Sequence, residues 1–253
     1  MNITIQDLRK LSLVFLVCLT ARVTLYAQQA DGTKIHDLFR KIADHYRNAG
    51  NLSFDVTYKY AAESDPGKWL DSMSGNFKMN NSSYWYMLDS TEAMGTRDYA
   101  LILFREDRVM YLSRPTSQTQ SANPLTQFDS LVLKDNRVKA SLAEEGSQEL
   151  VTLEFQPGLV YKRITYYIDR KTYFLTRMIS MVRSDQLYEK SVRPMIKGTD
   201  SYVIVETDYN HYQRGGFTEG DLDTGRYFKK VGGDYTAVPP YDSYKILLAS
   251  SNL

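Results

Sequence analysis

A period of two in the apolar residues limits the fold of this chain more than any other feature. From Leu52 to Tyr60 every second residue is apolar or aromatic, and the residues between are polar. Such alternation is typical of a β-strand with one face in a core and the other in water. The pattern predicts further strands at 69–79, 83–90, 99–105, 108–114, 136–143, 149–156, 160–169, 172–183 and 201–212.

Short polar turns join several of these segments, for example at 80–81, 105–107 and 169–171. Tight turns favour antiparallel hairpins, because parallel strands need longer crossover connections. The stretch 117–129 is rich in Ser, Thr and Gln and predicts a loop. Beyond Gly215 the alternation gives way to a Gly- and Asp-rich loop, with a last short strand expected at 244–248.

One helix is predicted before the first strand, from Asp31 to Gly50. Asp31 or Thr33 can cap its start, and Gly50 suits its end. Its apolar residues recur at helical spacing and form one stripe, made of Ile35, Leu38, Phe39, Ile42 and Tyr46. We therefore expect a mainly β (α+β) fold: a curved antiparallel sheet, or incomplete β-barrel, with the N-terminal helix packed on its concave face through Ile35, Leu38, Phe39 and Ile42.

Two of the predicted strands, 99–105 and 172–183, are apolar on both faces. A strand of this kind is buried on both sides. One helix does not cover so much apolar surface, so we expect a further layer or a ligand against the sheet.

Residues 1–27 have the pattern of a secretory signal peptide. Arg9 and Lys10 precede the apolar run 11–19, and Ala27 closes the stretch. The run is too short for a stable membrane span. We expect cleavage near Ala27, a periplasmic mature protein, and a single domain over 28–253. Cys18 lies inside this leader, so the mature chain would have no disulfide and no cysteine-based site.

Charge and composition exclude some classes of partner. The net charge is +1 and no run of like charge occurs, so an electrostatic nucleic-acid surface is not expected. The chain has 20 Tyr and 10 Phe, which favours sheets with amphipathic faces.

Motifs for known catalytic or metal chemistry are missing from the sequence. The zinc-protease, serine-hydrolase, P-loop and dinucleotide-binding patterns do not occur. His36, His45 and His211 lack metal-ligand spacing, and the acidic run from Glu219 to Asp223 lacks the register of a calcium loop. We therefore predict a non-enzymatic protein without cofactor or metal. A hydrolase built from dispersed carboxylates stays open as an alternative.

Several segments resemble the periplasmic outer-membrane lipoprotein carriers, the LolA/LolB-like family, over about 35–212. Residues 52–56 are similar to the first strand of that family, and 74–78 with Tyr84 and Leu88 to its next hairpin. The segment 105–115 resembles a family strand, with Tyr111 and Pro115 in matching places, and 167–175 resembles a later hairpin. The family holds its helical lid with an arginine a few residues after the position of Gly75, where this chain has Asn80 and Asn81.

The resemblance implies an incomplete barrel whose apolar cavity shields acyl chains. We expect Phe54, Phe77, Tyr86, Leu103, Tyr111 and Ile168 to line this cavity, with their inward direction inferred from alternation. The expected function is that of a monomeric periplasmic carrier for lipoproteins or other lipidated or hydrophobic ligands, with a lipid or acylated protein as partner and an inner- or outer-membrane protein as a further one. The alternatives are an envelope protein-binding module of the same fold, such as a stress sensor or accessory subunit, and an unrecognised hydrolase.

Overall fold

The computed structural model describes residues 32–115, 137–186 and 201–249. The predicted leader, its cleavage site and the predicted loop 117–129 lie outside these residues. A helix spans 32–48 and is followed by Gly50 in the left-handed conformation, at φ 67°. Its predicted stripe is buried: Ile35, Leu38, Phe39, Ile42 and Tyr46 all belong to the main hydrophobic core.

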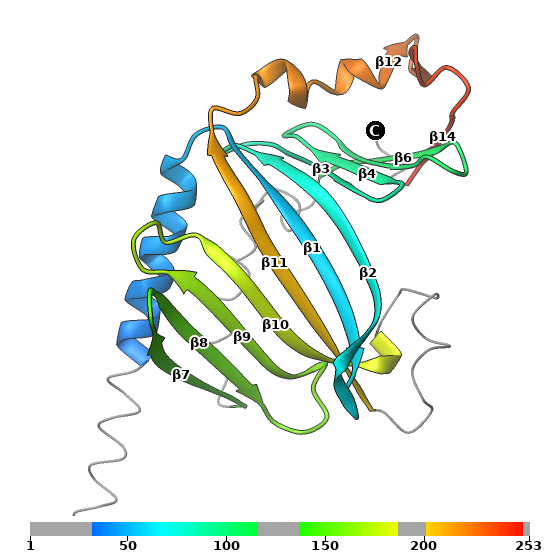
Figure 1. The fold of residues 1–253 in the computed structure, drawn as a ribbon. Helices are drawn as coiled ribbons and strands as arrows, with labels where there is room; N and C mark the ends of the chain where they lie inside the picture. Colours follow the sequence, from blue (N-terminus) through cyan, green and yellow to red (C-terminus); the bar gives the residue numbers. More distant parts are fainter. Residues whose placement is uncertain (1–31, 116–136, 187–200, 250–253) are drawn as a thin grey trace, which may run out of the picture.

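In the described residues, twelve strands form one sheet, and two more form a separate hairpin. The strands are β1 (Leu52–Ala62), β2 (Asp65–Met79), β3 (Tyr84–Leu88), β4 (Thr91–Gly95), β5 (Ala100–Phe104), β6 (Val109–Ser113), β7 (Val138–Glu145), β8 (Gln148–Phe155), β9 (Tyr161–Asp169), β10 (Leu175–Arg183), β11 (Tyr202–Arg214), β12 (Phe228–Val231), β13 (Asp234–Ala237) and β14 (Lys245–Leu248). The large sheet has the order β14-β6-β5-β4-β3-β2-β1-β11-β10-β9-β8-β7. Since β14 and β7 end this order without pairing to each other, the sheet is open (Figure 1).

The sheet is curved, and its concave side carries the helix. We call the helix-bearing side the inner face; its buried residues in the central strands include Leu52, Phe54 and Val56 of β1 and Tyr166 of β9. The opposite side is the outer face. The predicted class, a curved antiparallel half-barrel with an N-terminal helix on its concave face, is confirmed.

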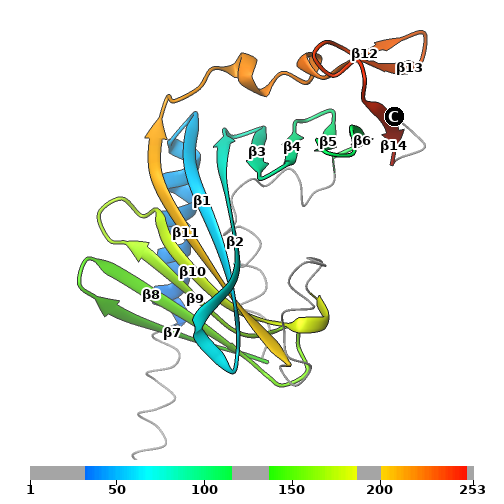
Figure 2. The ribbon, with the colours of Figure 1, turned by 45° about the vertical axis from the view of Figure 1, so that its right-hand side comes forward.

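Strands β3–β6, with β14 at their edge, turn away from β2 as a separate part of the sheet, which we call the shelf (Figure 2). Gly75 lies at this turn. A Cβ atom there would lie 2.1 Å from the carbonyl oxygen of Met87, so only glycine lets β3 approach β2 so closely.

The segment after β11 covers the outer face of the shelf. It contains the short 3₁₀ turns η3 (Glu219–Leu222) and η4 (Thr224–Arg226) and the β12–β13 hairpin. We call residues 216–244 the outer cover (Figure 1). Tyr227 and Phe228 of the cover pack with apolar residues of the shelf in a second core, which contains Met94, Leu101, Leu103, Met110 and Leu112.

A buried carboxylate fastens the outer cover to the shelf. Glu92 of β4 is 2% exposed. Its Oε1 accepts hydrogen bonds from Trp85 Nε1 at 2.7 Å and from the Tyr227 hydroxyl at 2.5 Å. Its Oε2 accepts from Arg105 Nε at 3.1 Å and from a second guanidinium nitrogen at 2.5 Å. Each carboxylate oxygen is thus satisfied, as a buried charge requires.

The structure corrects the sequence prediction in three places. Strand β4 lies in a stretch that was predicted as a connection between 83–90 and 99–105. The hairpin β12–β13 lies where a loop was predicted. The last strand, β14, is present as expected, but it pairs with β6 in parallel, from Lys245 with Val109 to Leu248 with Leu112.

Candidate functional site

A row of apolar side chains crosses the inner face from the central strands to the edge of the shelf. The row follows direct cross-strand partners: Phe54, Phe77, Tyr86, Ala93, Ile102 and Tyr111, on β1 to β6 in turn. Directly opposed residues in neighbouring strands project to the same side of the sheet. The whole row therefore lies on the inner face, and we call it the inner row.

The first half of the inner row is a continuous aromatic stack. The ring centroids of Phe54 and Phe77 are 5.3 Å apart, and those of Phe77 and Tyr86 are 4.9 Å apart. Tyr212 of β11 extends the stack, with its ring 4.9 Å from that of Phe54. Aromatic pairs at such distances contribute about 0.5–1.5 kcal/mol each beyond their buried area. This half of the row is a fixed wall of the core.

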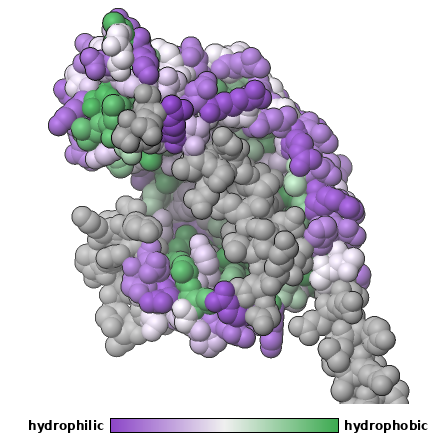
Figure 3. All heavy atoms as spheres, turned by 180° about the vertical axis from the view of Figure 1, so that it is seen from behind, coloured by the Kyte–Doolittle hydropathy of each residue, from purple (hydrophilic) through white to green (hydrophobic). Residues whose placement is uncertain are grey.

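Beyond Ala93, which is buried, the second half of the inner row is open to solvent. Ile102 is 40% exposed, Tyr111 is 41% exposed, and Phe104, on the same face, is 38% exposed. Phe104 packs edge-to-face on Tyr111 at 5.8 Å. Figure 3 shows the molecule hollowed on this side, with apolar atoms above and below the hollow.

No charged side chain occupies an inner-face position of β3–β6. The strand register places the following residues there: Tyr84, Tyr86, Leu88, Thr91, Ala93, Gly95, Ala100, Ile102, Phe104, Val109, Tyr111 and Ser113. The exposed part of this face therefore favours uncharged, apolar ligands.

Five of the six predicted cavity residues lie on the inner face. Phe54, Phe77, Tyr86 and Tyr111 belong to the inner row, and Ile168 lies in the main core with Phe54. Their contact with a ligand stays a prediction. Of these five residues, Tyr111 is the most exposed to solvent, whereas Ile168 is fully buried in the core.

Leu103 is the exception, and its predicted place must be corrected. It lies on the outer face of β5, fully buried beneath the outer cover. Its neighbours Ile102 and Phe104 take the inner-face positions that the prediction gave to Leu103. Because 99–105 is apolar on both faces, alternation alone could not fix which set points inward. The strand register decides which set points inward. Ile102 pairs with Ala93 of β4 and with Tyr111 of β6, so it belongs to the inner row and Leu103 faces the other side.

The helix is fixed to the inner face by more than apolar packing. The hydroxyl of Tyr46 lies 2.8 Å from the hydroxyl of Tyr212 and accepts a hydrogen bond from the Leu175 N–H at 3.3 Å. Burial raises the pKa of Tyr46 to about 12, so this hydroxyl stays neutral. These bonds join the helix to β10 and β11.

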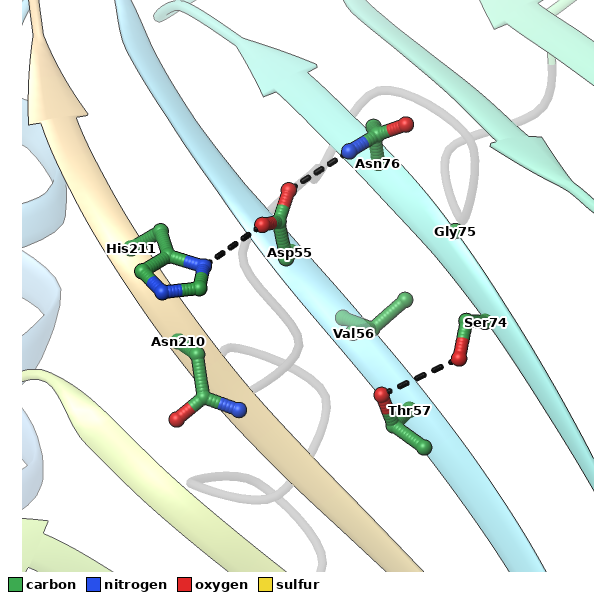
Figure 4. Close-up of a pocket in the computed structure, with 8 residues that line it drawn as sticks. All are labelled: Asp55, Val56, Thr57, Ser74, Gly75, Asn76, Asn210 and His211. Atoms are coloured by element: carbon green, nitrogen blue, oxygen red, sulfur yellow. Dashed lines mark hydrogen bonds and ion pairs between the residues drawn. The ribbon is translucent and has the colours of Figure 1, made fainter.

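A second, polar depression of about 370 Å³ lies on the outer face, over β1, β2 and β11 (Figure 4). Asp55 accepts a hydrogen bond from Asn76 Nδ2 at 2.5 Å and lies 2.7 Å from His211 Nδ1. The Thr57 and Ser74 hydroxyls lie 3.2 Å apart. The His211 side chain is 76% exposed, so water surrounds this pair and weakens its electrostatic interactions.

The described residues were searched for a metal site and for a membrane-spanning helix. They contain no group of three or more His, Cys, Asp or Glu side chains that could hold a metal ion. No helix in the same residues is long and apolar enough to cross a membrane.

The fold and its inner face define an open β half-barrel with an exposed apolar wall. No protein-family model and no curated protein matches the sequence. Similar solved structures include an uncharacterized conserved protein from Thermus thermophilus, with a TM-score of 0.46 and 10% identity over 83% of this chain and 98% of that chain.

Two further similar structures carry descriptive names. A LolA superfamily protein from Nitrosomonas europaea has a TM-score of 0.34 and 9% identity, over 74% of this chain and 97% of that one. The lipoprotein LppX from Mycobacterium tuberculosis has a TM-score of 0.37 and 13% identity, over 72% and 97%. At these TM-scores and identities the likeness carries no functional argument.

Proposed function

We propose that this protein is a non-enzymatic binding protein for acyl chains, and that the ligand lies on the inner face of the shelf. One observation carries the proposal: Ile102, Phe104 and Tyr111 are exposed on a face that leads, through the buried Ala93, to the partly buried aromatic stack. Exposed apolar patches on soluble proteins are typical of sites for ligands or partners.

An acyl chain suits this surface energetically. Each methylene group that leaves water contributes about 0.8 kcal/mol. A chain that covers the exposed half of the inner row gains this energy without a charge partner, and the inner-face positions of β3–β6 supply none. The sheet itself lies behind a chain bound on the inner face and limits the access of water to the chain from that side.

The role that follows is that of a periplasmic carrier for lipids or lipidated proteins. The apolar run 11–19 after Arg9 and Lys10 supports export, with removal of the leader near Ala27. N-terminal sequencing of the mature protein tests this step, and a mature chain that retains Cys18 would contradict it. The mature chain acts as a monomeric domain over 28–253 and meets a membrane protein when it loads or delivers its ligand.

Binding of an uncharged apolar dye, N-phenyl-1-naphthylamine, tests the site. Ile102→Asp and Tyr111→Asp each place a charge on the exposed half of the inner row. Each change should weaken dye binding about tenfold or more, because burying an apolar side chain contributes about 1.5–3 kcal/mol and the charged residue loses this contribution. Val231→Asp is the matched control, since Val231 is 56% exposed on β12.

Thermal melting of each variant checks that the fold survives. Equal dye affinity for the wild type, the inner-row variants and the control would contradict the site. A wild type that binds no dye would contradict the function and would favour the protein-binding module.

A further inference from the structure

Strand β14 adds one charged residue to the inner face of the shelf. Ile246 pairs with Met110 of β6, and both contact the second core on the outer face. Because side chains alternate along a strand, the residues on either side of Ile246, which are Lys245 and Leu247, project to the inner face. Lys245 accordingly lies beside Val109, which has an inner-face position on β6. The edge of the inner face thus carries a lysine.

Among the described residues, the Lys245 side chain has no partner. It is exposed, and its ammonium group makes no hydrogen bond and no ion pair with them. Glu106 and Asp107, in the turn between β5 and β6, are also exposed and form no ion pair with it. Since the inner-face positions of β3–β6 hold no charged side chain, Lys245 is the single charged residue on the described inner face of the shelf.

Lys245 adjoins the exposed apolar residues directly. Val109 pairs with Phe104 of β5, so Lys245, Val109 and Phe104 form a line across three neighbouring strands. Neighbouring strands are about 4.8 Å apart, so the line spans about 10 Å. Phe104 packs on Tyr111, and Ile102 is exposed on the same face. One end of the exposed apolar surface is therefore positively charged, and the rest of it is uncharged.

We propose that the ligand of the inner face is an acyl chain with an anionic end, as in a fatty acid. Its carboxylate pairs with Lys245 at the edge of the sheet, and its chain runs inward across β6 and β5 over Tyr111, Phe104 and Ile102. This inference rests on the proposed function and names the class of ligand.

The charge of the ligand follows from the free ammonium group of Lys245. This group has three donors and a positive charge, and a carboxylate supplies the matching acceptors and the opposite charge. An acyl chain beside Lys245 keeps water away, and a charge pair is stronger where water is excluded. The uncharged strands β3–β6 hold the hydrocarbon part, so the charge of the ligand lies beyond them, at the edge.

Displacement of bound N-phenyl-1-naphthylamine by three ligands of equal chain length tests the inference. Dodecanoate has a negative end, dodecanol a neutral end and dodecylammonium a positive end. The wild type should bind dodecanoate about three- to tenfold more tightly than dodecanol, a factor between those of an exposed ion pair and of a charge-assisted hydrogen bond. Dodecylammonium should bind most weakly. The preference for dodecanoate should shrink at high salt, because salt screens an exposed charge pair.

Two variants isolate the contribution of the lysine. Lys245→Gln should remove the preference for dodecanoate, and Lys245→Glu should reverse it in favour of dodecylammonium, while dodecanol binds as before. Lys229→Glu is the matched control, since Lys229 is exposed on β12 in the outer cover and the change alters the net charge equally. Thermal melting checks the fold of each variant, and Lys245→Gln alone decides the test if Lys245→Glu does not fold.

The outcomes separate this inference from the proposed function. Equal affinity of the wild type for dodecanoate and dodecanol, or a preference for dodecanoate that survives in Lys245→Gln, would overturn the anionic ligand and leave an apolar site in place. Failure of all three ligands to displace the dye, or failure of the dye to bind, would overturn the acyl-binding function itself.

Discussion

At the scale of single residues, Glu92 shows how a charge is kept inside an apolar layer. Burial by itself would raise the pKa of this carboxyl, but hydrogen bonds from Tyr227, Trp85 and Arg105 outweigh burial and lower its pKa. A carboxylate whose pKa is lower in the folded state than in the unfolded chain stabilises the fold at neutral pH. This contribution is lost as the pH falls through the folded-state pKa.

We therefore expect Glu92→Gln to lower the free energy of unfolding by about 1–3 kcal/mol at neutral pH, since charge-assisted hydrogen bonds become weaker ones. The wild type should lose this advantage between neutral and acidic pH, so the two stability curves should converge. Denaturation at a series of pH values measures both curves. Glu106→Gln, at an exposed turn, is the control. Curves that stay parallel down to acidic pH would contradict the role of Glu92.

The directions of some side chains could be predicted from the sequence, and those of others could not. The inward direction of Phe54 and Phe77 follows from the alternation of apolar and polar residues in their strands. Tyr111 lies between Met110 and Leu112, so alternation alone does not give its direction. The direction of Leu103 does not follow, because Ile102 and Phe104 are as apolar as Leu103 is. Glu92 and its partners could not be anticipated, because their contacts join positions up to 135 residues apart.

At the scale of elements, strands with a clear alternation or a continuous apolar run were predictable, and short strands of mixed composition were not. Strand β1 has eleven residues and an unmistakable period. Strands β4, β12 and β13 have five, four and four residues, and charged or polar residues interrupt each of them, so neither an alternation nor an apolar run stands out. The parallel pairing of β14 with β6 is a long-range contact that no local pattern encodes.

The helix offers a test of whether it belongs to the core or moves as a lid. Leu38 is 5% exposed in the main core, and Tyr46 is hydrogen-bonded to β10 and β11. Leu38→Ala should therefore lower the free energy of unfolding by about 2–5 kcal/mol, the usual cost of such a cavity. Dye affinity of the folded variant should stay unchanged. Denaturant unfolding and dye titration measure the two effects.

Lys34→Ala, on the exposed side of the same helix, is the matched control. A Leu38→Ala protein with wild-type stability and altered dye affinity would show that the helix acts as a lid.

At the scale of the whole molecule, the two faces of the shelf have different roles. The outer face is closed by residues of the same chain, through Tyr227, Phe228 and the bonds to Glu92. The inner face keeps Ile102, Phe104 and Tyr111 exposed. The sequence predicts more apolar surface on the sheet than one helix can cover. The outer cover accounts for part of this surface. The remaining apolar surface is the site that we assign to a ligand.

Photo-crosslinking tests this assignment most directly. A fatty acid with a photoactivatable diazirine in its chain is bound to the wild-type protein and irradiated, and the modified peptides are identified by mass spectrometry. The account predicts adducts on inner-face residues of β5 and β6, around Ile102, Phe104 and Tyr111, and their loss when unlabelled fatty acid competes. Competed adducts confined to the outer face or the outer cover, or no competed adducts at all, would contradict the claim that this sheet binds acyl chains on its concave side.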